Sequence, residues 1–331
     1  MGSVFVALLV GAANAPKPRG ALYVVGPSGG KPKRIVAHCI EGFAWSPDGK
    51  SIAYARLIKD DASPDVSELV DVQSGARHRL GNNGRPEPPA WSPDSTRIAY
   101  PRGDDIVVVP RVGSAEPVEL NGVPGEPGTY YSAYWPAWSP DGEHVAFTTF
   151  SQQVAVVGPD GSDLRFVTDE NVAGLAVPVR WLPDSDHLLF VGGGPNEGGG
   201  PLMEVTVAGA ELRRITPAGS NIVLFSVSRD GRRIAYTDEA TNYSISVANA
   251  DGTDARRIAR GLVGDNAWSP NGKRLVFEGE NGLYVINADG TGKRKLASKV
   301  GGDGIASVTA SWSSRNQIAY IADAGSCGGT S

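Results

Sequence analysis

The stretch WSPDGKSIAY, residues 45–54, contains a tight turn between two extended segments. In its centre, Pro fixes φ, Asp can bond to its own backbone, and Gly accepts a positive φ, a combination typical of tight turns. After the turn, Ile52 and Tyr54 alternate with Ala53, so the two large side chains share one face of a strand. The stretch therefore predicts two antiparallel strands, the first of which ends at Trp45.

The same stretch recurs seven times, at intervals of 41–47 residues. The copies begin at Trp45, Trp91, Trp138, Trp181, Val227, Trp268 and Trp312. Each copy is followed by a third apolar segment, for example Leu69–Val72, and by another turn before a fourth segment. Four short strands in this spacing form one blade of a β-propeller. The chain is therefore predicted to be all-β, with antiparallel blades of four strands.

The two ends of the chain complement each other. Residues 22–36 supply the third and fourth strands of a blade, and residues 312–321 supply the first and second. Pairing both ends within one blade closes the ring and removes the open edges of a linear array. This count predicts seven blades, with six as the alternative if the copy at Val227 is not a blade.

The WSPDG-x₂-IAY copies resemble the repeat of TolB-like β-propellers, a WD-like fold that also occurs in propeller domains of prolyl-oligopeptidase-like hydrolases. The resemblance covers residues 21–322 and implies the fold. Function has to be argued from sites, because this fold serves many functions.

Composition and the N-terminus indicate an exported protein. Residues 4–10 are an apolar run, and Ala13-Asn14-Ala15 fits a small-x-small cleavage site. We therefore expect a signal peptide at residues 1–15, although no basic residue precedes its apolar run. Residues 16–331 should form a single propeller domain that is periplasmic or secreted. After Pro16 no apolar run is long enough to span a membrane. The net charge of −5 and the lack of a basic block argue against nucleic acid as a partner.

Several motifs that resemble chemical sites are explained by the repeat. Gly26-Pro27-Ser28-Gly29-Gly30 matches G-x-S-x-G, but a strand is expected after it where a nucleophile elbow needs a helix. The four histidines lie in different repeats without metal-ligand spacing, and each repeat has its own turn carboxylate or amide. We expect no metal, no cofactor and no catalytic residue.

The only two cysteines, Cys39 and Cys327, are expected on the same face of the closing blade. An exported protein could oxidise them to a disulfide that ties the two ends of the chain together.

Residues just before each repeat Trp are expected to line the channel at the centre of the ring. The candidates for ligand or partner binding there are Glu41, Glu87, Tyr134, Trp135, Arg180 and Asp265. Aromatic residues on a rigid scaffold can anchor a partner, although Tyr134 and Trp135 could equally fill space between blades.

The sequence favours a monomeric, non-catalytic scaffold that recognises a protein or a glycan in the cell envelope. Two alternatives stay open. One is a carbohydrate-active lyase or hydrolase that uses Glu41, Glu87 and Asp265 at the channel mouth. The other is the propeller domain of a prolyl-oligopeptidase-like peptidase.

Overall fold

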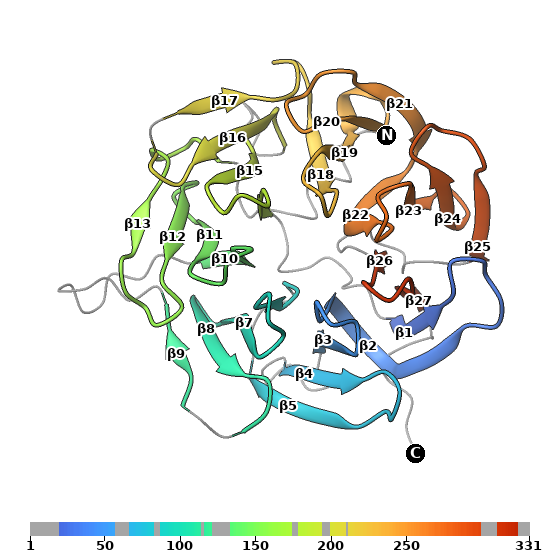
Figure 1. The fold of residues 1–331 in the computed structure, drawn as a ribbon, viewed down its shortest axis with the longest axis horizontal. Helices are drawn as coiled ribbons and strands as arrows, with labels where there is room; N and C mark the ends of the chain where they lie inside the picture. Colours follow the sequence, from blue (N-terminus) through green and yellow to red (C-terminus); the bar gives the residue numbers. More distant parts are fainter. Residues whose placement is uncertain are drawn as a thin grey trace.

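The computed structural model describes residues 20–56, 66–82, 87–113, 116–120, 133–173, 178–193, 199–209, 211–298 and 310–323. These residues form a ring of β-sheets around a central axis (Figure 1). Five sheets have four strands each, and one has seven strands because β2 belongs to two neighbouring blades. Counting that sheet as two blades gives the predicted seven-bladed, all-β propeller.

In blades 1 to 6 the strands run in chain order from the centre of the ring to its rim (Figure 1). Blade 1 contains the second half of β2 (Lys33–Trp45), β3 (Ser51–Arg56), β4 (Val66–Asp71) and β5 (Arg77–Asn82). Blade 2 contains β6 (Ala90–Trp91), β7 (Arg97–Arg102), β8 (Asp105–Pro110) and β9 (Val118–Glu119). Blade 3 contains β10 (Ala133–Trp138), β11 (Val145–Thr149), β12 (Val154–Val157) and β13 (Arg165–Phe166).

Blades 4 to 6 repeat this order. Blade 4 contains β14 (Val179–Trp181), β15 (His187–Val191), β16 (Leu202–Thr206) and β17 (Leu212–Arg214). Blade 5 contains β18 (Ile222–Val227), β19 (Arg233–Asp238), the short 3₁₀ helix η1 (Glu239–Thr241), β20 (Ser244–Asn249) and β21 (Arg256–Arg260). Blade 6 contains β22 (Leu262–Trp268), β23 (Arg274–Gly279), β24 (Gly282–Asn287) and β25 (Arg294–Ser298).

The closing blade joins the two ends of the chain, as predicted. It contains β26 (Ala310–Trp312), β27 (Ile318–Asp323), β1 (Gly20–Val25) and the first half of β2. β1 pairs with β27 along its whole length, with Leu22 opposite Ile321. β2 then continues without a break from the rim of this blade to the centre of blade 1, where two separate strands were expected.

Tryptophans of the repeat connect neighbouring blades. The indole N–H of Trp91 donates to the backbone oxygen of Ala44, and that of Trp181 to Ala137, at 3.1 and 2.9 Å. In both cases the acceptor immediately precedes the Trp of the preceding blade. These bonds satisfy the polar edge of a large side chain whose rings are otherwise buried between blades. The inner strands are thereby fixed in position around the channel.

Candidate functional site

The turns that follow the inner strands hold their carboxylates in place. In blade 1 the hydroxyl of Ser46 and the amide of Lys50 both donate to Oδ1 of Asp48, at 2.6 and 2.9 Å. Blade 2 repeats the arrangement, and there the Ser92 hydroxyl, followed by the amide of Thr96, holds the pKa of Asp94 below its usual value. These aspartates therefore stabilise their turns.

A cavity of about 270 Å³ lies where the inner strands face the axis of the ring, and we call it the channel cavity. Its walls combine Trp and Pro with polar and charged groups. The Trp and Pro residues are Trp45, Pro47, Pro88, Pro89, Trp91, Trp135, Pro136 and Trp312. The polar and charged residues include Arg180, Arg229, Asp265 and Asn266. Of the six residues predicted for this region, the structure brings three together in its wall, namely Trp135, Arg180 and Asp265.

Arg180 and Asp265 form an ion pair across the channel. Nη2 of Arg180 contacts Oδ1 of Asp265, and the two side chains are only 20% and 15% exposed. Arg180 lies on β14 in blade 4 and Asp265 on β22 in blade 6, so the pair spans the inner strand of blade 5. Both residues also line an adjoining cavity of about 290 Å³, whose wall contains Trp181 and Trp268 as well. Two partly desolvated charges therefore lie between the two cavities. A polar ligand in either cavity could replace the contact between Arg180 and Asp265 with contacts of its own.

Trp135 has a strained backbone. Its φ is +56°, a conformation that is a genuine outlier for a bulky residue. The strain coincides with a break in register between Tyr134 and Ala137, where β10 departs from regular pairing with β11. Such conformations cost about 1–3 kcal/mol and concentrate at functional sites. The side chain is half-buried and lines the channel cavity.

The other three predicted residues lie elsewhere or outside the described side chains. Glu87 is buried, at 9% exposed, directly before the two prolines that line the cavity. Tyr134 is half-buried, and its backbone oxygen accepts a bond from Thr148 Oγ1 at 3.5 Å. Glu41 lies within β2, but its side chain is not among those described.

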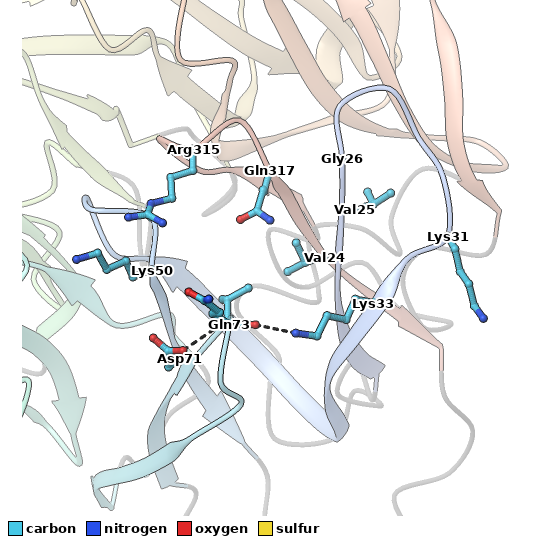
Figure 2. A pocket seen from close by; sticks show the side chains of 12 residues that line it. Val24, Val25, Gly26, Lys31, Lys33, Lys50, Asp71, Gln73, Arg315 and Gln317 are labelled. Atoms are coloured by element: carbon cyan, nitrogen blue, oxygen red, sulfur yellow. Dashed lines mark hydrogen bonds between the residues drawn. The ribbon is translucent and has the colours of Figure 1, made fainter.

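A second and larger hollow, about 590 Å³, lies at the seam between the closing blade and blade 1 (Figure 2). We call it the seam cavity. Basic side chains predominate around it. They are Lys31, Lys33, Lys50 and Arg315, with Asp71 as the one carboxylate in the lining.

The closing blade departs from the repeat at this seam. At three other seams the arginine that begins the second strand lies over the next Trp: Arg97 over Trp138, Arg233 over Trp268 and Arg274 over Trp312, at 4.6, 4.9 and 5.1 Å. At the closing blade the corresponding residue is Gln317, which lines the cavity. The sequence analysis did not predict this site. One signal was present in the sequence, because Arg315 occupies the turn position that Asp48 occupies in blade 1, with the opposite charge.

Other expectations concern metals, membranes and the cysteines. Within the described ranges, no group of three or more His, Cys, Asp or Glu is placed to hold a metal ion. No helix in that same part of the chain has the length and apolarity to cross a membrane. Residues 1–15, the side chain of Cys39 and Cys327 lie outside what the structure describes, so the signal peptide and the disulfide stay predictions.

Comparison with known families agrees with the repeat. The sequence profile of the TolB beta propeller domain matches residues 127–320, more than half of the chain. The chain belongs to the TolB beta-propeller family. A relative from Agrobacterium fabrum, an uncharacterized protein, is 26% identical over 191 residues. The match covers 52% of this chain and 62% of that protein, less than two thirds of its length.

Solved propellers with several functions share the fold. A TolB-like protein from Agrobacterium tumefaciens is 15% identical, with a TM-score of 0.56, over 93% of this chain and 99% of that one. An oligogalacturonate lyase in complex with manganese is 14% identical, with a TM-score of 0.66, over 93% and 98%. A prolyl endopeptidase is 17% identical, with a TM-score of 0.59, over 85% of this chain and 46% of that one. At such identities the likeness is one of fold alone.

Proposed function

We propose that this TolB-family propeller is an exported, monomeric, non-catalytic scaffold that binds an extended segment of a partner protein in its channel cavity. The observation that carries the proposal is Trp135, a strained aromatic residue in the wall of that cavity. Residues held in sparsely populated backbone conformations cluster at active sites and ligand clamps. Export rests on the expected signal peptide at residues 1–15.

The lining of the channel cavity suits a peptide. Trp and Arg are the residues most enriched at the energetic centres of protein interfaces. Grooves lined by aromatic side chains are one of the ways in which proteins bind extended, Pro-rich peptides. Arg180 and Asp265 supply one charge of each sign, so together they could bond the carbonyl and amide groups of a bound backbone.

A carbohydrate-active enzyme is the alternative from a different class. It finds support in the fold of the oligogalacturonate lyase, which this chain shares at 14% identity. However, the Asp265 carboxylate is engaged by Arg180 and would have to exchange that partner before acting as a base.

One experiment separates the two functions. Immobilised wild-type protein and the Trp135→Ala variant are exposed to cell-envelope extract, and bound proteins are quantified by mass spectrometry. Phe150→Ala is the matched control, since Phe150 is 64% exposed and lies in the turn between β11 and β12. We expect a partner that Trp135→Ala loses and Phe150→Ala keeps. Release of unsaturated products or reducing ends from a polysaccharide panel by the same preparation would instead establish the enzyme.

A further inference from the structure

The seam cavity is a local concentration of positive charge on an acidic protein. The chain has a net charge of −5, yet four basic residues and a single carboxylate line this hollow. A recess lined by one sign of charge focuses the electrostatic field and raises the local concentration of counter-ions.

The one carboxylate in the lining, that of Asp71, accepts hydrogen bonds from its own turn through one of its two oxygens. Oδ1 of Asp71 accepts bonds from the amides of Gln73 and Ser74 and from the Ser74 hydroxyl, at 3.1, 2.7 and 2.7 Å. These bonds belong to the turn after β4. Oδ1 of Asp71 therefore serves its turn, and the carboxylate offsets one of the four positive charges in the lining.

Two of the basic groups are held in place by bonds across the seam. Nζ of Lys33, from the closing blade, donates to the backbone oxygen of Val72 in blade 1 at 2.9 Å. Nε of Arg315, also from the closing blade, donates to the backbone oxygen of Asp48 at 2.9 Å. An ammonium has three N–H donors and a guanidinium five, so each group keeps donors for a ligand. Figure 2 shows Lys33 and Arg315 reaching from different sides of the hollow, while Lys31 points away from it.

The closing blade differs from the repeat in ways that remove negative charge from this face. Arg315 replaces the aspartate found at the same point of the turn in blade 1. The turn after β1, residues 26–30, contains no acidic residue, whereas Asp160, Asp251 and Asp289 occupy the corresponding turns of blades 3, 5 and 6. The cavity is thus not a product of the repeat but a departure from it.

We propose that the seam cavity binds a small anion with at least two negative charges, of the phosphate-ester or polycarboxylate class, and that this ligand bridges the closing blade and blade 1. The volume of about 590 Å³ is in the range of small-molecule sites. Lys33 and Arg315 are the principal ligand contacts, and Lys50 adds charge at the rim. This site is separate from the channel cavity and does not depend on the function proposed for it.

The test is isothermal titration calorimetry on the full chain at low ionic strength. The probes are inorganic pyrophosphate and citrate, which distinguish the phosphate from the carboxylate source, and neutral maltotriose. The double variant Lys33→Gln/Arg315→Gln removes the two principal contacts. Arg165→Gln/Arg214→Gln, on the outer strands β13 and β17, removes the same charge at exposed sites far from the seam. Lys50→Gln removes rim charge without removing a bond across the seam.

We expect saturable binding of at least one anion and none of maltotriose. The double variant at the seam should lose about tenfold or more in affinity, since it removes two charge-assisted hydrogen bonds to the anion. Lys50→Gln should lose about threefold, and the outer-strand double variant should stay within about twofold of wild type. Absence of saturable binding, or equal losses in the two double variants, would overturn the proposal.

Discussion

The indole Nε1 of Trp45 donates to the backbone oxygen of Ser311 at 3.3 Å, joining residues 266 positions apart. Equivalent bonds elsewhere join blades that are consecutive in the chain, such as Trp91 to Ala44, 47 positions apart. The Trp45 bond instead links blade 1 to the blade built from both ends of the chain. It therefore contributes to closure of the ring, together with the pairing of β1 and β27.

Removal of Trp45 should open this seam. Trp45→Ala is expected to cost about 3–5 kcal/mol of folding free energy, as for other buried aromatics, measured by chemical denaturation. Trp181→Ala is the matched control, because Trp181 makes the same bond within an uninterrupted part of the chain. Limited proteolysis should release the strands of the closing blade faster in Trp45→Ala. Equal release from both variants would show that Trp45 has no special role in closure.

Acid should destabilise the propeller through its turn aspartates. The pKa values of Asp48, Asp71, Asp94, Asp141, Asp184 and Asp230 are all lowered in the folded state. As pH falls, these carboxylates take up protons in the unfolded chain before they do so in the folded one. Their contribution to the free energy of unfolding is therefore complete above the ordinary pKa of 3.8 and is lost as pH falls through the lower pKa of the folded state. The denaturant concentration at the midpoint of unfolding should be lower at pH 3 than at pH 6. An unchanged midpoint would contradict the assignment of these carboxylates to the turns.

The strained backbone of Trp135 predicts an unusual ranking of substitutions. Glycine adopts positive φ without steric cost, so Trp135→Gly should be more stable than Trp135→Ala by about 1 kcal/mol. Tyr134 is the neighbouring control, because it does not have positive φ, and there alanine should be the more stable replacement. Thermal denaturation of the four variants provides the comparison. The same ranking at both positions would refute the strain.

The Arg180–Asp265 pair should show energetic coupling. Single replacements, Arg180→Met and Asp265→Asn, each leave a partly buried charge without its partner, so the double variant should be less damaged than the sum of the two. A double-mutant cycle on unfolding free energy is expected to give about 1–3 kcal/mol of coupling. Additive effects would mean that the pair does not persist in solution.

Sequence reasoning predicted the fold well because the repeat is local. Each WSPDG-like copy contains its own turn chemistry, and counting the copies was enough for seven blades and for closure by the two ends. The continuity of β2 between two blades was missed, since nothing local in residues 37–40 distinguishes a continuing strand from a connection.

The sites were less accessible to such reasoning. Trp135, Arg180 and Asp265 were chosen for their position before a repeat Trp, and all three line one cavity; their role in binding stays a prediction. Nothing in the sequence, however, reveals the positive φ of Trp135 or the ion pair between Arg180 of blade 4 and Asp265 of blade 6. The seam cavity also depends on which turns meet when the ring closes, which a pattern along one chain does not contain.

A binding titration measures whether the channel cavity recognises a protein segment through Trp135. A peptide selected from a display library against the wild-type protein is labelled and titrated by fluorescence anisotropy against wild type, Trp135→Ala and Phe150→Ala. We expect at least about a tenfold loss of affinity for Trp135→Ala, as for an interface hot spot, and no change for Phe150→Ala. Unchanged affinity in Trp135→Ala, with both variants folded, would contradict this expectation.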